Sequence, residues 1–498
     1  MFVYFLSMST SPRYEFWGDD SEIFQAVGAC WAQGYLPYVD LFENKGALIF
    51  LIDALGWTIA PRVGIMLLQI PAMYLSMLFM WRTLGLYLSG KTRLAAMAMT
   101  LIYYALYYLD GNRTEEWSMP FLSAAMYLFL RGLKNSQWSP YVGLIDGVGF
   151  GACVMLRTTN ALPLCCCALL SAIFLLRDGE LKLLLKNLLT FCAGVVIMLL
   201  PFAVYFAAHG ALDAATYGTI ILNVAYSAQR ENFLLTHLDE FAIYVFLNFM
   251  PLYLLIVVSA AELLKNRTRL ALSGLICGAA MLLMLFKLSP YPGYCALIVP
   301  LIPLFFAVAA TFAENFRALW RVEGFSLKRV LCKALIVLIM FYPLTIGYIF
   351  AARFAKENSD FIRQFHIKQN AEITRLAEVV ATEKNSVMMW GESFPLCHWI
   401  LLTGIVPRCR FFGNVKAFAN IDPNVKREWL ETARNKPPHW IIYVTHTAEF
   451  TGDYPENWTR HFRQNRDADV ERLLHERYNL AGEAEVYQDA FRLYRLKE

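Results

Sequence analysis

The segment from Trp17 to Gly46 combines acidic residues with a lysine directly before an apolar run. Asp19 and Asp20 stand near its start, and Lys45 stands near its end. A carboxylate at a membrane boundary can act as general base toward a hydroxyl, and a lysine can hold a phosphate as a point charge. Together the three residues suit a reaction that removes a phosphate leaving group from a membrane-embedded lipid.

The same residues also have a purely structural interpretation. Asp19 or Asp20 is a good N-cap for a helix predicted over Ser21–Gln33. Gly34 can end that helix as its C-terminal cap. Lys45 can be an interface anchor whose stem lies along apolar surface. The two interpretations both stay open when only these residue types are considered.

A second acidic segment, Asp110–Trp117, reads DGNRTEEW. The Asp-Gly-Asn run is typical of a turn, and Thr114 can cap the next helix with Glu115 and Glu116 in its first turn. The alternative is that Glu115 or Glu116 binds sugar hydroxyls, or shares a divalent cation with Asp19. Hard cations accept such carboxylate oxygens, and the use of a metal is left open.

Further candidate residues stand at two other helix ends. Arg157 follows an apolar stretch, where a charge is costly and is usually functional or paired. Its guanidinium fork suits a phosphate, although it could equally be an interface arginine that reaches toward water. Lys287 and Tyr291 lie in the proline-containing segment Phe286–Tyr294, where they are candidate contacts for a phosphate or a sugar.

Membrane helices must position these segments. The 498 residues are 58% hydrophobic and only 17% charged, with a mean hydropathy of +0.43, which excludes an ordinary soluble enzyme. A span needs about 20 mainly apolar residues, and the chain is predicted to have about 10–11 of them. The windows are Val63–Trp81, Leu94–Leu109, Trp117–Leu130, Tyr141–Leu156, Ala161–Leu176, Leu188–Ala208, Phe241–Ala261, Leu270–Phe286, Tyr294–Phe312 and Ala334–Ala352.

Two apolar stretches near the N-terminus are too short to count as spans. Ala47–Ala60 is predicted to lie at the interface or at the entry to the first span. Met1–Thr10 is about half a membrane thickness. Either the chain starts upstream of Met1, or this first helix is short and interfacial.

Lysine and arginine residues gather in every second connection between the windows. By the positive-inside rule these connections are cytoplasmic, so the acidic segments face outward. Residues 353–498 then also lie outside, and they hold 41 of the charged residues of the chain, the density of a soluble domain. The cytoplasmic set is Arg82, Lys91, Arg93, Arg131, Lys134, Arg177, Lys182, Lys186, Lys265, Arg267, Arg269, Arg317, Arg321, Lys328 and Arg329.

The outer domain, residues 353–498, alternates helical and strand patterns, which predicts a small α/β layer. Cys397 and Cys409 could pair there in an oxidising compartment. The net charge of +4 without a basic cluster argues against a nucleic-acid partner. Helices are predicted over Phe361–Lys384, Pro423–Asn435 and Asp469–Tyr478, and strands over Ser386–Trp390, Trp440–Val444, Glu485–Tyr487 and Phe491–Tyr494.

The acidic segments resemble those of GT-C membrane glycosyltransferases, specifically the bacterial family 39 with its protein mannosyltransferase-like and aminoarabinose transferase-like enzymes. The resemblance rests on Asp19-Asp20, on Gly34, on Pro37-Tyr38, on Lys45-Gly46 and on the Gly-Asn-x-Thr-Glu-Glu sequence that ends at Glu116. Three positions depart from the family pattern. Asp20 replaces a glutamate, Gly46 a proline, and Gly293 a histidine.

The resemblance implies a catalytic membrane domain over residues 1–352, with a first outer loop over 11–46, and a C-terminal extracytoplasmic domain. It makes Asp19 the general base, with Asp20 orienting it or the acceptor. It also makes Lys45, with Arg157 and Lys287, the ligands of the donor phosphate.

The implied reaction moves a sugar, with inversion, from a polyprenyl-phosphate donor to a hydroxyl of a cell-envelope glycan, lipid or protein. The protein would act at the outer face of the inner, cytoplasmic membrane. The alternatives are a lipid-linked glycan transporter or flippase, which typically has internal repeats and polar residues at the midplane, and a glycan polymer transferase similar to O-antigen ligases.

Overall fold

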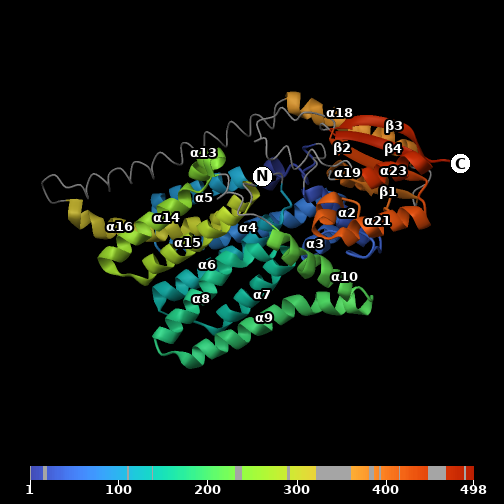
Figure 1. Ribbon diagram of the computed structural model, residues 1–498. Coiled ribbons are helices and arrows are strands. Elements are labelled where there is room, and N and C mark those ends of the chain that lie inside the picture. Colours follow the sequence, from blue (N-terminus) through green and yellow to red (C-terminus); the bar gives the residue numbers. More distant parts are fainter. Residues whose placement is uncertain are drawn as a thin grey trace.

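The structure is a computed structural model that describes residues 2–14, 20–108, 111–136, 138–229, 238–288, 292–320, 360–380, 386–391, 394–413, 415–446, 467–486 and 489–498. A large helical body carries a small sheet with its own helices at one end (Figure 1, upper right). The membrane-type helices and the charge-rich C-terminal part thus occupy different regions of the molecule.

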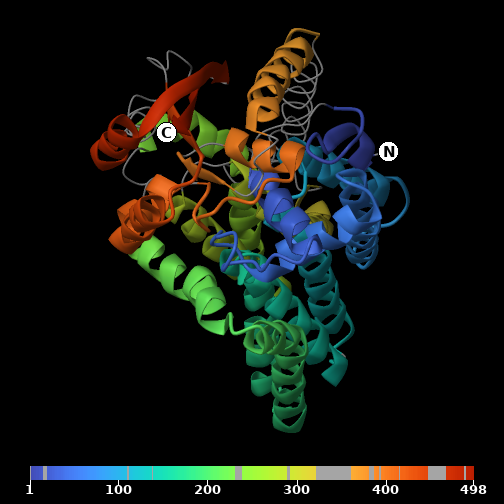
Figure 2. The ribbon, with the colours of Figure 1, turned by 90° about the vertical axis from the view of Figure 1, so that its right-hand side faces the viewer.

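The helical body is built from apolar helices that alternate in direction. Its described elements are α1 (Phe2–Leu6), α3 (Ala47–Ile59), α4 (Val63–Gly85), α5 (Gly90–Tyr107), α6 (Thr114–Asn135), α7 (Pro140–Leu156), η1 (Thr158–Ala161), α8 (Leu162–Arg177), α9 (Leu181–Ala208), α13 (Leu238–Asn248), α14 (Met250–Asn266), α15 (Arg269–Lys287), η3 (Pro292–Leu301) and α16 (Ile302–Trp320). In Figures 1 and 2 the hairpin of α8 and α9 lies at the bottom and the sheet at the top.

Five helical stretches in the described part of the chain are long and apolar enough to cross a membrane. They are Val63–Gly85, Thr158–Arg177, Leu181–Ala208, Arg269–Lys287 and Gly293–Glu314. Each coincides with a predicted window, so the expectation of a polytopic helical membrane protein is confirmed. Four other windows also fall on helices, and the window Ala334–Ala352 lies outside the described residues.

One predicted span, Phe241–Ala261, is wrong as a single helix. The structure divides it at Phe249 into α13 and α14. Pro251 stands in the first turn of α14, where its missing N–H costs nothing, but it could not continue a helix from α13.

Glycines bring α7 close to α9. A Cβ on Gly143 would lie 2.2 Å from the backbone oxygen of Asn187, and one on Gly147 would lie 2.1 Å from that of Phe191. No side chain fits at either position. Small residues of this kind let two membrane helices approach at backbone distance.

An outer layer covers one end of the helical body. It contains α2 (Asp20–Ala32), α10 (Leu212–Thr216), the π-helical turn η2 (Tyr217–Ile221) and α11 (Leu222–Gln229). The predicted helix over Ser21–Gln33 is α2, and Gly34 follows it with a φ of 95°, as a C-terminal cap requires.

The C-terminal part forms a four-stranded mixed sheet in the order β1-β2-β4-β3. β1 and β2 are parallel, and β4 pairs antiparallel with both β2 and β3. The predicted helices and three of the predicted strands coincide with observed elements. The strand predicted over Glu485–Tyr487 is only the end of β3, which begins at Tyr478, a residue predicted to be helical, and α19 and α20 were not predicted. The elements are α18 (Asp360–Val380), β1 (Val387–Trp390), α19 (Phe394–Thr403), α20 (Val415–Ile421), α21 (Pro423–Asn435), β2 (Trp440–His446), α23 (Ala468–Arg477), β3 (Tyr478–Val486) and β4 (Asp489–Leu496).

The sheet layer and the first outer loop share one hydrophobic core. Phe24 and Phe50 belong to the same buried cluster as Trp399 and Phe412 of the C-terminal part. The backbone N–H of Phe42 also donates to the carbonyl of Arg410 at 2.8 Å. The first outer loop is therefore held between the membrane helices and the sheet.

Cys397 and Cys409 are both free, buried thiols. The disulfide considered from their shared location is thus not formed. Cys397 lies on α19, in the core shared with the first outer loop, and Cys409 lies in the cluster of buried residues around Trp390 and Trp429.

Candidate active site

Lys45 stands at the end of the first outer loop, two residues before the start of α3. Its ammonium lies 3.3 Å from Glu43 Oε1 and donates to Asn44 Oδ1 at 3.0 Å. The backbone around it is fixed, because the Tyr38 hydroxyl donates to the carbonyl of Lys45 at 2.7 Å and Asn223 donates to that of Asn44 at 2.7 Å. The lysine is therefore held in one place by groups from two loops.

Arg157 occupies the turn between α7 and η1. Its Nη1 lies 3.1 Å from Glu115 Oε1 at the start of α6. Its Nη2 donates to the Tyr294 hydroxyl of η3, and the guanidinium carbon is 4.4 Å from the centre of that ring. Segments distant in sequence thus meet around one guanidinium.

Gly46 brings these two cationic positions together. A Cβ on Gly46 would lie 2.2 Å from the backbone oxygen of Met155, and the N–H of Gly46 donates to the Leu156 carbonyl. The Lys45-Gly46 pair thus runs directly against the turn that presents Arg157. This close approach is a physical reason for a glycine here, where a side chain would not fit.

The charges of this cluster act on one another. Burial works to lower the pKa of the Lys45 ammonium, but the charges of Glu43 and Asp20 outweigh it and hold that pKa above its ordinary value. Burial raises the pKa of the Glu43 carboxyl, although Lys45 opposes the rise. The positive charge of Arg157 acts to lower the pKa of Lys45, so two like charges share the site.

Asp20 is the accessible carboxylate among those described in the cluster. One third of its side chain, 33%, is exposed, against 3% for Glu43 and 4% for Glu115. Asp20 Oδ2 lies 3.5 Å from Nη1 of Arg113. The two cations keep 18% (Lys45) and 19% (Arg157) of their side chains exposed. An incoming ligand can therefore reach both cations and Asp20.

Glu116 faces a different set of groups from its neighbour Glu115. Its Oε1 accepts from the Tyr108 hydroxyl at 2.6 Å and from Gln69 at 3.0 Å, and its Oε2 accepts from the N–H of Asn112 at 2.6 Å. These bonds lie among buried side chains. Glu116 thus fixes the loop 111–113, which precedes α6, onto α4.

Asn112 is the centre of that loop. It has a φ of 57°, in the left-handed region that asparagine tolerates better than most residues. Its amide donates to Ser21 Oγ and to Asp53 Oδ2, both at 3.1 Å, and its oxygen accepts from the Trp117 indole at 2.9 Å. The loop 111–113 is thereby tied to α2, next to Asp20, and to α3.

The proposed capping role of Thr114 is wrong. The cap of α6 is Arg113, which makes no side-chain capping bond, and Thr114 is already inside the helix. Its hydroxyl donates to Glu115 Oε2 at 3.1 Å. Thr114 thus helps to orient a carboxylate that faces Arg157.

A buried carboxylate–imidazole pair joins α2 to the C-terminal part. Glu22 Oε1 lies 3.2 Å from Nδ1 of His398 on α19, and both side chains are buried. Burial raises the pKa of the Glu22 carboxyl, and His398 opposes the rise. Glu22 stands two residues after Asp20 on α2. The C-terminal part therefore contacts the helix that carries Asp20.

The predicted site residues have different outcomes. Lys45, Asp20, Glu115 and Arg157 are brought together at one end of the body. Asp19 and Tyr291 lie outside the described residues. Lys287 is exposed at the end of α15, and its side chain makes no ion pair with the described part of the chain.

Nothing in the described part of the chain assigns a metal to the cluster. Among these residues no three His, Cys, Asp or Glu side chains converge as metal ligands would. Glu115, the predicted cation ligand that is described, is paired with Arg157. Asp19, its predicted partner in such a site, is not among the described residues.

Several residues of the cluster were not singled out from the sequence. Tyr294 stands in the same segment as the predicted Tyr291, so the segment was identified but not the residue. Glu43 lies only two positions before Lys45, and this spacing could have identified it from the sequence. The pair of Glu22 and His398 has no sequence signal, because 376 positions separate its members.

Comparison with known proteins agrees with this geometry. Residues 45–206, which include Lys45, Glu115 and Arg157, match the dolichyl-phosphate-mannose-protein mannosyltransferase family. No curated protein matches the chain in sequence. Over these residues the chain is similar to that family, and its fold is that of a multi-pass helical membrane protein.

Solved structures share the fold at low sequence identity. ArnT from Cupriavidus metallidurans, solved with undecaprenyl phosphate, superposes with a TM-score of 0.59 and 11% identity, over 99% of this chain and 96% of that chain. The Archaeoglobus fulgidus oligosaccharyltransferase, solved with a tethered acceptor peptide, has a TM-score of 0.51 and 12% identity, over 97% of this chain and 70% of its own. At these identities the likeness establishes the fold alone.

Proposed function

We propose that this protein is a glycosyltransferase that moves a sugar from a polyprenyl-phosphate donor to a hydroxyl of a cell-envelope acceptor, with inversion at the anomeric carbon. The observation that carries the proposal is the meeting of Lys45 and Arg157 at one end of the helical body. Both keep part of their side chains exposed, and both are surrounded by carboxylates. The acceptor is a glycan, a lipid or a protein of the envelope.

The donor phosphate binds between the two cations. Arg157 offers a planar fork of N–H groups, and Lys45 adds a compact positive charge. Glu115 and Tyr294 orient the fork, and Glu43 orients the ammonium. Two neighbouring cations repel each other, and a phosphate placed between them relieves that repulsion.

The transfer itself is a single displacement. A carboxylate removes the proton of the acceptor hydroxyl, and the acceptor oxygen forms a bond to the anomeric carbon. The bond from that carbon to the phosphate oxygen breaks, and its electron pair leaves with polyprenyl phosphate. Lys45 and Arg157 stabilise the negative charge that develops on this leaving group.

The general base is one of the acidic pair at the start of α2. Asp19 is assigned as the base by the resemblance to the family, and Asp20 orients it or the acceptor. Support comes from Asp20, whose side chain is partly exposed and whose charge acts on Lys45, Glu43 and Arg157. A proton acceptor at this place lies near the phosphate that leaves.

The reaction takes place at the outer face of the inner membrane. In the structure the candidate site and the sheet layer lie at one end of the helical body. The connections that carry most of the lysine and arginine lie at the other helix ends, as in the turn that joins α8 to α9. This asymmetry supports an extracytoplasmic site under the positive-inside rule.

The direct test uses the purified full chain in proteoliposomes. It is incubated with polyprenyl-phosphate donors that carry radiolabelled hexose or pentose, together with cell-envelope extracts. We expect label to move to the acceptor fraction, and free polyprenyl phosphate to appear in equal amount. Passage of intact donor across the bilayer without cleavage would instead support a flippase and contradict the proposal.

Two substitutions identify the phosphate ligands. Lys45→Gln and Arg157→Gln should each lower kcat/KM by about 100-fold, the loss typical of one charge-stabilising donor. Lys182→Gln, an exposed lysine at the start of α9 and at the opposite helix end, is the matched control and should leave the rate unchanged. Wild-type rates in both site variants would contradict the assignment of the phosphate site.

A third substitution tests the base. Asp19→Asn should abolish transfer while the protein level stays normal. Asp20→Asn, its neighbour, should lower the rate less if Asp20 orients the acceptor and does not take the proton. Full activity of Asp19→Asn would disprove the role of Asp19 as base, without bearing on the donor class.

A further inference from the structure

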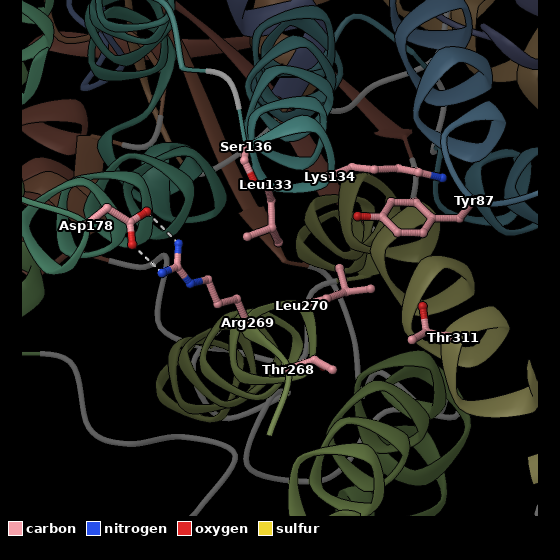
Figure 3. Close-up of a pocket in the computed structure, with 9 residues that line it drawn as sticks. All are labelled: Tyr87, Leu133, Lys134, Ser136, Asp178, Thr268, Arg269, Leu270 and Thr311. Atoms are coloured by element: carbon pink, nitrogen blue, oxygen red, sulfur yellow. Dashed lines mark hydrogen bonds and ion pairs between the residues drawn. The ribbon is translucent and has the colours of Figure 1, made fainter. Parts of the chain in front are cut away.

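A second polar pocket lies at the end of the helical body opposite the candidate active site. It has a volume of about 480 Å³. Figure 3 shows Tyr87, Lys134, Asp178 and Arg269 on its walls, with Leu133, Leu270 and Thr311 between them. These residues come from four helix ends or their adjoining turns and from the middle of α16, so the pocket is built by the packing of the bundle and not by one loop.

The course of α6 locates this pocket at the other membrane boundary. Glu115 at the start of α6 belongs to the candidate active site, and Lys134 near its end lines the pocket. With a rise of about 1.5 Å per residue, the two are separated by about 30 Å, the thickness of the hydrocarbon core. The pocket thus lies at the depth of lipid headgroups.

Two cations face the pocket from different helices. The Lys134 ammonium lies 4.6 Å from the centre of the Tyr87 ring and donates to the carbonyl of Leu86. Arg269 begins α15 and makes a two-bond ion pair with Asp178, in which Nη1 lies 2.7 Å from Oδ2 (Figure 3). Two cations against one carboxylate leave the pocket with a net positive charge.

The rest of the lining is amphipathic. Tyr87, Ser136 and Thr311 offer hydroxyl groups, and Leu133 and Leu270 offer apolar surface. A free inorganic ion would use the charges but not the apolar walls. A membrane lipid would use both, with its phosphate on the cations and the upper part of its acyl chains on the leucines.

We propose that this pocket binds the phosphate group of an anionic phospholipid from the leaflet opposite the candidate active site. Basic pockets between membrane helices are known to hold anionic headgroups in this way. Arg269 contacts the phosphate oxygens and Ser136 donates a further hydrogen bond, while Lys134, beside Tyr87 on the other side of the pocket, adds positive charge (Figure 3). The site is independent of the sugar transfer proposed above, because none of its residues belongs to the donor or acceptor cluster.

Asp178 provides a specific test of the proposal. Its carboxylate already holds the two Nη groups of Arg269, so it competes with a lipid phosphate for the same donors. Removal of this charge with retention of the side-chain shape frees Arg269 for the lipid. The Asp178→Asn variant is therefore expected to bind the anionic lipid more tightly, whereas a merely structural ion pair predicts no gain.

The test is native mass spectrometry of the detergent-purified full chain titrated with phosphatidylglycerol or with phosphatidylcholine. We expect preferential retention of phosphatidylglycerol. Lys134→Gln and Arg269→Gln should each weaken it about fivefold, the effect of one cation at an anionic surface. Arg131→Gln is the control, because Arg131 is exposed one turn away on α6 but does not line the pocket.

Three results of the lipid titration would overturn the proposal. They are equal retention of both lipids, equal weakening by Arg131→Gln, and weaker binding by Asp178→Asn. A parallel titration with inorganic phosphate, read by the thermal unfolding midpoint, separates the two sources of phosphate. Stabilisation by phosphate alone, with no response to phosphatidylglycerol, would also overturn it.

Discussion

The two ends of the helical body both carry ion pairs, but they carry them in different surroundings. At the end with the candidate active site, Glu115 and Arg157 keep 4% and 19% of their side chains exposed. At the opposite end, Asp178 and Arg269 keep 34% and 37% exposed. One end is covered by the outer loops and the sheet layer, and the other ends in short turns.

This difference determines what each pair can do. A buried charge that loses its partner is left without water or a counter-charge, which is strongly destabilising. An exposed pair is screened by solvent and contributes little to stability. Charges at the covered end are thus held in fixed positions, as a transfer reaction requires. Charges at the open end are free to exchange partners with a ligand.

The largest expected effect is at the covered pair. Glu115→Ala leaves the largely buried Arg157 without its carboxylate, so we expect a loss of about 3 kcal/mol in unfolding free energy, at the lower end for a buried pair because part of Arg157 is exposed. The measurement is an unfolding titration from mild detergent into dodecyl sulfate. Glu115→Gln, which keeps a hydrogen-bond acceptor, is the control and should lose less. If Glu115→Ala unfolds along the same titration curve as the wild type, burial of the ion pair does not distinguish the two ends.

The next effect concerns the close approach that joins the two cationic positions. Gly46→Ala places a Cβ 2.2 Å from the Met155 oxygen, so a backbone must shift. We expect a loss of about 1–3 kcal/mol, as for overpacking, together with a lower transfer rate because Lys45 moves. Gly413→Ala is the control, since its Cβ would meet only Cys397 Sγ at 3.5 Å. Equal losses of stability and of transfer rate in Gly46→Ala and Gly413→Ala would contradict this prediction.

A smaller effect is expected in the pH dependence of stability. The pKa of Glu22 is raised in the folded state, chiefly by burial, so the folded chain binds this proton more tightly than the unfolded chain. Its contribution is full below the unfolded pKa and is lost as the pH rises through the folded pKa. Because His398 opposes the rise, His398→Gln should extend the loss of stability to higher pH.

The measurement for this prediction is the unfolding midpoint of His398→Gln and of the wild type across a range from about pH 4 to about pH 8. Glu22→Gln carries no titrating group and should remove this part of the slope in both backgrounds. If the slope of His398→Gln with Glu22 intact matches that of the wild type, the pair does not couple as described.

The smallest effect is expected at the open end. Asp178→Ala removes an exposed partner, so the unfolding midpoint should stay close to that of the wild type in the absence of added lipid. The same titration that detects the loss in Glu115→Ala serves here. A loss as large as that of Glu115→Ala would show that exposure does not separate the two ends.

Some features of the site follow from local sequence patterns. The helix α2 and its glycine cap, the acidic start of α6 and the lysine before α3 are all marked by residues within a few positions of one another. The positions of Lys45, Glu115 and Arg157 at helix ends on one side of the helical body also follow from the alternation of apolar windows and basic connections. The expectation of a polytopic helical protein with a C-terminal α/β part is confirmed, because these patterns are local in sequence.

Other features depend on contacts that no local pattern reports. Glu115 and Glu116 are adjacent and were both predicted as ligands, yet one faces Arg157 and the other faces Tyr108 and Gln69. Successive residues of a helix point about 100° apart, and only packing decides which direction is the site. The break between α13 and α14 was missed because hydropathy averages over Pro251.

The sequence by itself determined the class of this protein. Its apolar windows require helices in a membrane, its basic connections predict which face is cytoplasmic, and its acidic segments contain the residues of the proposed site. Tertiary structure alone decided which of these groups meet. Three contacts join segments that are far apart in the chain, and the sequence does not indicate that they meet. They are Gly46 with Met155, Glu115 with Arg157, and Glu22 with His398. Burial in a shared core, set by the whole fold, fixes their distances and their charges.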